Sequence, residues 1–443
     1  MKKKVINLIE TKRITELKQI LKKMMAQDIS DLFKELNDEN MIITFRLLSK
    51  DKAVDTFAYM DVDQQESLIN AITDNDLSDI VNELFIDDAV DLIEEMPSNV
   101  VKRILKSIDT ENRNIINDLL KYPAGSAGSI MTTEFVDLKD FMTVDEAFEK
   151  IKKIAVDKET IYTCYVLNES RKLIGIVTVK TLLLADRKVK IKDIMDTELI
   201  TVNTSDDQEE VVNLIRKYDF DAMPVVDLEE RLVGIVTVDD AIDVIQKEAD
   251  EDFAKMAAIT PSTESYFKTS VLKHTKNRIL WLVIMMFSAI IIGSIIMNYE
   301  HAFEVVPILV AFIPMLMDAG GNCGAQASTL IIRGLSVGEI KHNDIWRLLW
   351  KELRISTLVG IALAILNGIR VVIQYGDLML AIVIGLTLVG TVIASKILGC
   401  ILPIVARKLR IDPAIMSAPL ITTIADAIAV LLYFNIAVAL LGI

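Results

Sequence analysis

The sequence SAPLITTIADAIAVLL, residues 417–432, is an apolar run with a single carboxylate, Asp426, about halfway along it. A charged side chain at bilayer depth is unfavourable by roughly 3 kcal/mol on insertion scales, so such a residue usually faces water or an ion. A second polar stretch, DAGGNCGAQASTLIIR at residues 318–333, lies inside another apolar segment. Together the two stretches predict a membrane domain that contains a cation pore.

Five segments are long and apolar enough to cross a bilayer. They are residues 279–298, 305–331, 353–375, 378–405 and 414–441. Basic residues gather before the first and last segments and between the second and third, so the positive-inside rule predicts a cytoplasmic N-terminus and an outward C-terminus in the cell membrane. Prolines and glycines in these segments predict broken helices that line a cavity.

The charge is divided unevenly between the two parts of the chain. Residues 272–443 hold 9 of the 63 acidic and 13 of the 48 basic residues, so they carry +4 and the preceding residues −19. Nucleic-acid binding needs clustered Lys and Arg, so an acidic soluble part excludes that partner and favours cations. Three scattered cysteines form no metal-ligand spacing, and the start, MKKKVINLIE, lacks a signal-peptide core.

Residues 1–125 repeat every 24 positions. Leu36, Met60, Leu84 and Ile108 are spaced in this way, and the apolar residues between them follow a helical period. Such a repeat predicts an acidic superhelical array of short helices. Asp87, Asp88 and Asp91 stand at the head of one predicted helix. They either hold a divalent ion or are solvated acids that complement the positive helix N-terminus.

Residues 126–188 and 189–246 form a duplicated unit. GIVTV occurs at Gly175 and again at Gly234, and Ile-Met precedes each copy, at residues 130–131 and 194–195. Each unit reads as β-α-β-β-α and resembles a CBS domain. The resemblance implies a regulatory pair that commonly senses adenine nucleotides, so ATP at this pair is left open.

An acidic amphipathic helix begins in VDDAIDVIQKEADEDF, and residues 247–272 are predicted to form the connecting helix that leads to the membrane domain at 273–443. Like charges three or four residues apart repel on a helix, so these acids either surround a divalent ion or form a solvated linker. The position between sensor and membrane favours the ion. The acids are Asp240, Asp243, Glu248, Glu251 and Asp252.

The chain resembles the MgtE magnesium transporter family in four features that follow the family's order along the sequence. They are the acidic helical start, the tandem CBS units and the two membrane motifs AGGNCGAQASTLIIRG and IDPAIMSAPLITTIAD. The resemblance implies a homodimer in the lipid bilayer, with a pore lined by the second and fifth spans. It assigns Mg²⁺ to the pore residues Asp426, Asp412 and Thr422, and regulatory Mg²⁺ to Asp87, Asp91, Asp207, Glu209, Asp219 and the five acids of the linker helix, which would act as a plug. Gly320, Gly321, Asn322 and Gln326 would line the pore.

Two residues fit this pattern less well. Lys396 lies within the fourth span, where the family more often has an uncharged residue, and we expect it to extend towards the cytoplasmic interface. Asp318 is a second intramembrane acid, which either joins the pore or caps a broken helix.

The sequence as a whole predicts a multidomain membrane protein with an all-α superhelical N-domain, an α/β CBS pair, a long plug helix and an all-α five-helix transmembrane domain. The leading hypothesis is a Mg²⁺ channel-like transporter that closes when cytoplasmic Mg²⁺ binds, because Mg²⁺ is held through retained waters by one or two carboxylates. Transport of Co²⁺ or Mn²⁺, or a membrane-anchored sensor that does not conduct, are the alternatives. An enzyme is the least favoured class, because the three histidines are dispersed.

Overall fold

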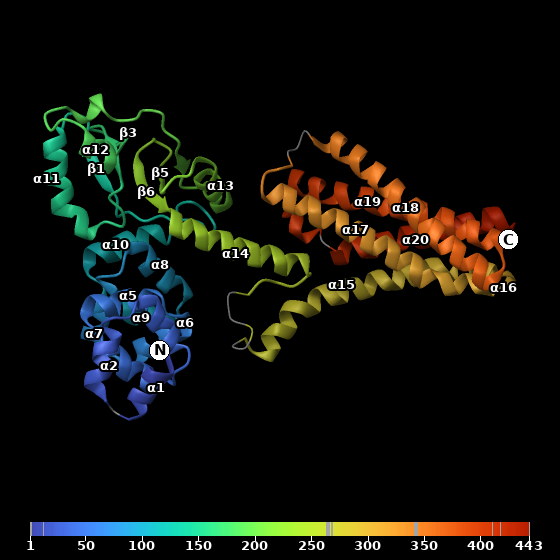
Figure 1. Cartoon of the computed structure of the whole chain (residues 1–443), viewed down its shortest axis with the longest axis horizontal. Helices are drawn as coiled ribbons and strands as arrows, with labels where there is room; N and C mark the ends of the chain where they lie inside the picture. Colours follow the sequence, from blue (N-terminus) through green and yellow to red (C-terminus); the bar gives the residue numbers. More distant parts are fainter. Residues whose placement is uncertain are drawn as a thin grey trace. The chain divides into compact units, whose positions relative to one another are not determined.

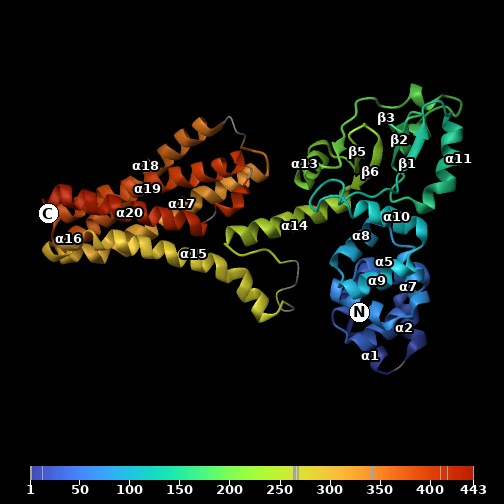
Figure 2. The same cartoon turned by 180° about the vertical axis from the view of Figure 1, so that it is seen from behind.

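The computed structural model describes residues 2–11, 13–262, 266, 269–340, 344–409, 411–416 and 418–442. Ser417, the first residue of the stretch that contains Asp426, lies outside them. The chain forms two compact units, Met1–Ile245 and Gln246–Ile443 (Figures 1 and 2).

The first unit begins with short helices joined by tight turns. Their bounds are α1 (Lys2–Glu10), α2 (Ile14–Leu21), α3 (Ala26–Phe33), α4 (Asp38–Phe45), α5 (Lys50–Ala58), α6 (Val62–Ala71), α7 (Asp74–Val81), α8 (Ile86–Glu95), α9 (Ser98–Ser107) and α10 (Thr110–Leu119). From α3 onward, every second helix starts 24 residues after its counterpart, as the sequence period predicts.

Burial of one apolar position in each repeat explains this array. Phe33, Phe57 and Val81 are at most 2% exposed, and the helices that carry them contact one another in series, α3 with α5, α5 with α7, and α7 with α9. Side-chain caps from Asn37 and Asp109 satisfy free backbone N–H groups at helix starts. The predicted helical superhelix is confirmed.

Two β-α-β-β-α repeats follow, as predicted. The first contains β1 (Val136–Lys139), α11 (Val144–Ile154), β2 (Thr163–Leu167), β3 (Leu173–Thr178) and α12 (Val179–Leu184). The second contains β4 (Val202–Asn203), α13 (Gln208–Tyr218), β5 (Ala222–Val226), β6 (Leu232–Thr237) and α14 (Val238–Met256). In each three-stranded sheet, the first strand pairs in parallel with the second, which is antiparallel to the third.

The Ile-Met segments are exchanged between the repeats. The sulfur of Met131, before β1, lies where a Cβ at Gly234 of the second repeat would be. The sulfur of Met195, before β4, lies where a Cβ at Gly175 of the first repeat would be. Backbone bridges join Thr132 to Ile235 and Ile176 to Asp196. Both glycines are required because a side chain would collide with the methionine. The exchange ties the two repeats into one body.

The same unit has a core that runs from the helical array into the second repeat. A single cluster of buried apolar residues includes Ile116 and Leu119 of α10 together with Val211 and Ile215 of α13. This shared core holds the start of α8 against the repeats, where the first candidate site lies.

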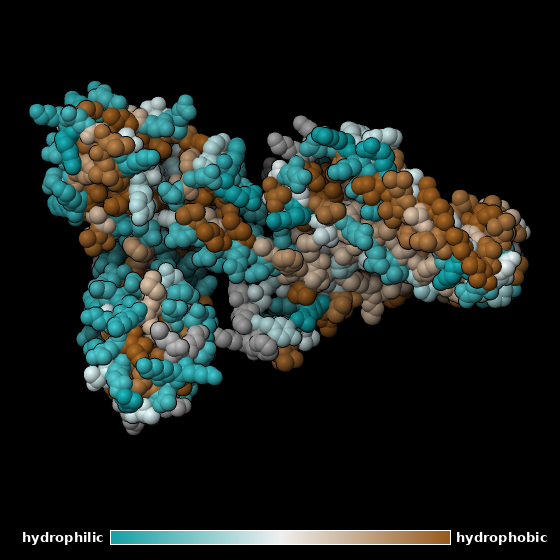
Figure 3. Space-filling model, viewed as in Figure 1, coloured by the Kyte–Doolittle hydropathy of each residue, from teal (hydrophilic) through white to brown (hydrophobic). Residues whose placement is uncertain are grey.

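The second unit contains five helices, among the described residues, that are long and apolar enough to span a membrane. Hydrophobic residues cover much of this unit in Figure 3. The spans are α15 (Val271–Met297), η3 with α17 (Pro307–Ser336), α18 (Ile345–Tyr375), α19 (Leu378–Lys408) and α20 (Ala418–Leu441), and the short α16 (Glu300–Val305) follows α15. The predicted spans are therefore present, and α15 and α18 begin eight residues earlier than expected.

The expectation of broken helices is mostly wrong. α17 is continuous through Gly320, Gly321 and Gly324, and α19 continues past Pro403. An added Cβ at Gly324 would lie 3.2 Å from the backbone oxygen of Ser395 on α19. These glycines allow close helix packing rather than unwinding, as small residues do at membrane helix interfaces. The irregular turns are η3 (Pro307–Phe312) before α17 and η5 (Pro413–Ile415) before α20.

Candidate ion-binding sites

Helix α17 has a polar face that the described residues of its own chain leave exposed. Asp318, Asn322 and Gln326 are exposed, and residues four apart lie on one side of a helix. Exposed polar groups at membrane depth are tolerated where they face protein or a water-filled cavity rather than lipid. The face formed by these three side chains, here called the α17 polar face, therefore requires a polar environment that the described residues of one chain do not supply.

Gly320 and Gly321 occupy the opposite, buried side of α17. A Cβ at Gly320 would lie 2.7 Å from Cγ2 of Thr391 on α19, and one at Gly321 would lie 2.9 Å from Cγ2 of Thr422 on α20. The structure therefore places them away from the α17 polar face, and their lining of a pore stays a prediction. They bring α19 and α20 close to α17.

Asp426 lies on α20 (Ala418–Leu441), one turn after Thr422. Both residues are half-buried, whereas the neighbouring Ala425 is fully buried. Thr422 donates its hydroxyl to the carbonyl of Pro419. Asp426 interacts electrostatically with Asp318 of α17. The structure thus brings the two intramembrane acids predicted from the sequence to neighbouring helices.

Lys396 forms a buried ion pair, which corrects the expectation that it extends to the interface. Its Nζ lies 3.8 Å from Oε2 of Glu352 on α18, and the two side chains are 8% and 10% exposed. An acid on the neighbouring helix compensates the lysine charge inside the bundle. Sequence alone gave no signal for this pairing, because the two residues are 44 positions apart.

Glu352→Gln is expected to destabilise the membrane unit by about 3–5 kcal/mol, because it leaves Lys396 as an uncompensated buried charge. The double variant Glu352→Gln/Lys396→Met, which removes both charges, should recover most of that loss. Size-exclusion chromatography of the detergent-solubilised protein after heating measures the difference. Equal unfolding temperatures for the single and double variants would show that the pair is not coupled.

Asp412 lies beside the last turn of α14, within the second unit. Its Oδ2 accepts a hydrogen bond from Nζ of Lys255 at 2.5 Å, while its Oδ1 accepts one from the backbone N–H of Ala414 at 2.8 Å. Lys255 also forms an ion pair with Glu251, one turn earlier on α14. The structure thus joins two of the predicted site acids through a lysine.

The pKa values in this group reflect mutual interaction. Partial burial first, then Asp412, raises the pKa of Asp252 above its usual range. Burial alone would lower the pKa of Lys255, but hydrogen bonds from its ammonium to Asp412 and Glu251 raise it, so the lysine is held charged. Glu248 also acts on Asp252. Asp243 is exposed on α14, two turns before Asp250, and belongs to no cluster among the described residues.

Of the three predicted acids of the second repeat, Asp207 and Glu209 lie together at the start of α13 and Asp219 lies at its end. Asp207 caps the start of α13, its side chain accepting from the backbone N–H of Glu209. Asp219 ends the same helix in the left-handed conformation, with φ 52°. An eleven-residue helix is roughly 16 Å long, so Asp207 and Asp219 cannot bind one ion together within a chain.

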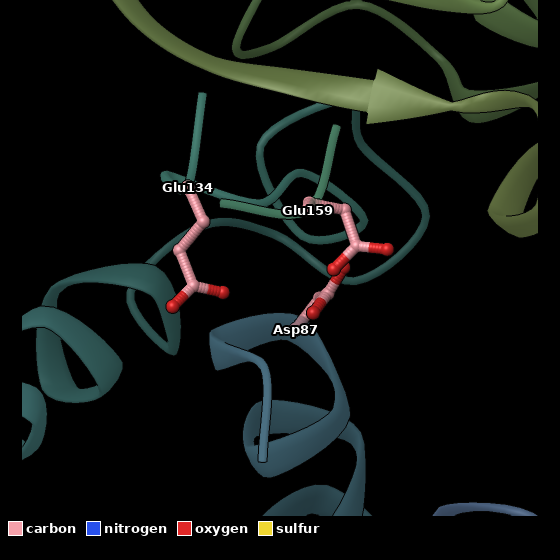
Figure 4. Close-up of side chains that lie close together, drawn as sticks. All are labelled: Asp87, Glu134 and Glu159. Atoms are coloured by element: carbon pink, nitrogen blue, oxygen red, sulfur yellow. The ribbon is translucent and has the colours of Figure 1, made fainter. Parts of the chain in front are cut away.

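Asp87 meets two glutamates from the first repeat. Carboxylate oxygens of Asp87, Glu134 and Glu159 lie within 4.8 Å of one another, from the first turn of α8 and from two loops (Figure 4). Glu134 accepts from the backbone N–H of Ile86 at 3.0 Å. Within the described part of the chain, the buried Oε2 of Glu159 accepts no hydrogen bond. The group has the spacing and the hard oxygen ligands of a divalent cation site.

Further acids surround these three. Asp240, at the start of α14, accepts a hydrogen bond from the hydroxyl of Thr237 at 2.6 Å and interacts with Asp87 and Asp91. Burial first, and then repulsion from neighbouring carboxylates, raises the pKa of Asp87 to about 7 and that of Asp240 to about 7. We call this set the acidic cluster of the first unit. Its members are Asp87, Asp88, Asp91, Glu134, Glu159, Asp239 and Asp240.

Sequence reasoning found Asp87, Asp88, Asp91 and Asp240 but missed Glu134, Glu159 and Asp239. Glu134 is isolated in MTTEF, and Glu159 follows Asp157 and Lys158 in the mixed-charge segment DKETI. No local pattern of charge marks either one, and only the packing of α8 against the first repeat brings them to Asp87.

Stability of the first unit should fall as pH rises from about 4 to 8. Burial raises the pKa of Glu159 to about 8, and Asp87 and Asp240 also titrate near 7. In this window the folded state binds more protons than the unfolded state, so raising the pH favours unfolding. Mg²⁺ should restore stability at pH 8.5 and have little effect at pH 5.5. Calorimetry of the purified chain measures both effects.

A pair of variants provides the control. Glu159→Gln should flatten the pH dependence, whereas Glu169→Gln, an exposed acid of the same unit, should leave it unchanged. An unfolding temperature that rises steadily from pH 5.5 to 8.5 without divalent ions would contradict the prediction.

The fold and these clusters define a multi-pass membrane protein with an acidic helical domain and a tandem pair of β-α-β-β-α repeats. Three family profiles match the chain: the MgtE intracellular N domain over residues 24–125, the CBS domain over 127–188 and 191–247, and the MgtE divalent cation transporter domain over 313–436. The chain is 40% identical to the magnesium transporter MgtE of Bacillus subtilis over 76% of its own length and 74% of that protein. It is 36% identical to MgtE of Thermus thermophilus, over 77% and 75% of the two chains.

The chain therefore belongs to the MgtE family of magnesium transporters, and it is a transporter rather than an enzyme. Its structure resembles the crystal structure of the cytosolic domain of the Mg²⁺ channel MgtE in complex with ATP, with a TM-score of 0.53 and 33% identity, over 55% of this chain and all of that one. A second solved structure, the soluble part of a magnesium transporter, has a TM-score of 0.52 and 31% identity, over 56% and 98% of the two chains.

Proposed function

We propose that this chain is a channel-like transporter selective for Mg²⁺, that it works as a homodimer, and that Mg²⁺ bound to cytoplasmic acids closes it. The observation that carries the proposal is the pairing of the α17 polar face with Asp426 of α20. Both lie in helices that are long and apolar enough to cross a membrane, and a second copy of the chain placed against them would enclose a water-filled path rather than expose them to lipid.

Mg²⁺ suits this path. It sheds its water reluctantly and is usually held by one or two carboxylates through retained waters. Two copies of Asp426 across a twofold axis, with amides of Asn322 and Gln326 nearby, would offer such a set of hard ligands. We place the intracellular mouth of the path at Asp412, which precedes η5 and the start of α20.

The orientation is part of the proposal. Basic residues lie at the start of α15, at the end of α17, at the start of α18 and at the end of α19, the ends that would share one side of the membrane. The positive-inside rule places that side in the cytoplasm, together with the first unit, and the C-terminus outside the cell membrane.

Closure would arise from the cytoplasmic acids. When cytoplasmic Mg²⁺ is scarce, the carboxylates in the acidic cluster of the first unit repel one another, and so do those around α14. An ion bound between them would favour the closed arrangement only by its differential affinity for that state. Regulatory ligands would come from Asp87, Asp91, Asp207, Glu209, Asp219, Asp240, Asp243, Glu248, Glu251 and Asp252, with Glu134 and Glu159 added by the structure.

Adenine nucleotide is a second proposed ligand, at the CBS pair. The related cytosolic domain was crystallised with ATP, and this chain has the same pair of repeats, joined by the exchanged segments at Met131 and Met195. Calorimetric titration of the purified chain with ATP tests this point independently of transport.

The deciding experiment is growth in low Mg²⁺. Cells that lack their own magnesium uptake should be rescued by this chain, and no rescue despite expression in the membrane would count against the proposal. Uptake by proteoliposomes then separates the alternatives. Uptake of Co²⁺ or Mn²⁺ in preference to Mg²⁺ would identify a different transported ion. An absence of flux for all of these ions would support the alternative of a membrane-anchored sensor that does not conduct.

A further inference from the structure

The last turn of α14 places a cation of the protein itself among the acids at the proposed pore mouth. Nζ of Lys255 is 2.5 Å from Oδ2 of Asp412 and also contacts the Glu251 carboxylate. The side chains of Lys255 and Asp412 are 22% and 29% exposed. The hydrogen bond from Ala414 to the other oxygen of Asp412 fixes the carboxylate in place. The ammonium therefore occupies a defined position rather than one of many surface contacts.

A divalent ion and this ammonium need the same oxygens. Carboxylates are the protein ligands that Mg²⁺ uses, directly or through its waters. Oxygens engaged by Lys255 are not available to Mg²⁺, and two cations a few ångströms apart repel. A side chain attached to α14 also acts at a high effective concentration, on the order of millimolar or more for tethered partners. Mg²⁺ must therefore displace Lys255 before it bridges Glu251 and Asp412.

We propose that Lys255 is a tethered cation that competes with Mg²⁺ for Glu251 and Asp412, and thereby sets the cytoplasmic Mg²⁺ concentration at which the channel closes. This inference rests on the proposed function. By this competition, Lys255 lowers the affinity of Glu251 and Asp412 for Mg²⁺. Size-exclusion chromatography of each variant shows whether it folds, so an effect of Lys255 on gating is distinguished from unfolding.

The test compares Lys255→Met with the parent in patch recordings, with Mg²⁺ titrated on the cytoplasmic face. Removing the competitor should lower the half-closing Mg²⁺ concentration about five- to tenfold. Lys255→Arg keeps the charge and should stay within about twofold of the parent. Lys180→Met removes the same charge from an exposed position on α12, away from the acids of α14, and is the control, expected to close as the parent does. Lys255→Gln repeats the test if the methionine variant expresses poorly.

The outcomes separate the two levels of the argument. If the parent conducts but does not close in Mg²⁺, the proposed regulation is overturned and Lys255 has nothing to tune. If the parent closes, and both neutral variants close at the same or a higher Mg²⁺ concentration, competition by Lys255 is overturned while regulation stands. A higher concentration would show that the lysine holds the closed state instead.

Discussion

Asp426→Ala is expected to cut Mg²⁺ flux in proteoliposomes by at least about a hundredfold while the protein still folds. A pair of unit charges 4 Å apart is worth about 4 kcal/mol at an effective dielectric of 20, and the interaction doubles for a divalent ion. The variant removes that attraction from both copies in the proposed dimer. Asp426 is only half-buried, so replacing it with a small apolar residue leaves the helix packing of α20 intact.

Asp426→Asn separates charge from hydrogen bonding. If Asp426→Asn loses as much Mg²⁺ flux as the alanine variant, the charge is required. A smaller loss of flux would show that an amide can hold hydrated Mg²⁺. Asp377→Asn is the matched control, because Asp377 caps α19 at Leu380 and asparagine also caps. Flux of Asp426→Ala equal to that of the parent would refute the assignment of Asp426 to the pore.

Neutralising three acids of α14 together is expected to produce a channel that stays active in millimolar cytoplasmic Mg²⁺. The variant is Glu248→Gln/Glu251→Gln/Asp252→Asn. A ligand shifts an equilibrium only by its differential affinity for the two states, and these acids would supply much of that difference. Patch recordings with Mg²⁺ on the cytoplasmic face measure the remaining closure, which should need at least about tenfold more Mg²⁺ than in the parent.

A matched triple variant controls for the change in total charge. Glu149, Glu169 and Glu198 are exposed acids away from the clusters, and their replacement by glutamine should leave closure unchanged. Removal of residues 1–125 should also leave the channel active. It is a less specific test, because Ile116 and Leu119 share a core with the second CBS unit and deletion would expose that surface. If the α14 variant closes as sharply as the parent, its acids are ordinary solvated surface.

The sequence by itself determined the architecture, because each element depends on a local or regularly repeated pattern. The 24-residue period predicted the superhelix, GIVTV at Gly175 and Gly234 predicted the two repeats, and continuous apolar segments predicted the five spans. Hydropathy also marked Asp426 and Asp318 as unusual. Apolar burial and backbone hydrogen bonding act over neighbouring residues, so their signal is present in a single stretch of sequence.

The partners of charged side chains were decided only by the tertiary structure. Glu352 neutralises Lys396 from another helix, and Glu134 and Glu159 join Asp87 from separate loops. Lys255 reaches Asp412 across 157 positions. Electrostatic interactions depend on distance in space and on the surrounding dielectric, neither of which a charge in the sequence reveals. The local sequence therefore identified candidate acids, whereas the packing of distant segments determined which of them act together and which cation lies among them.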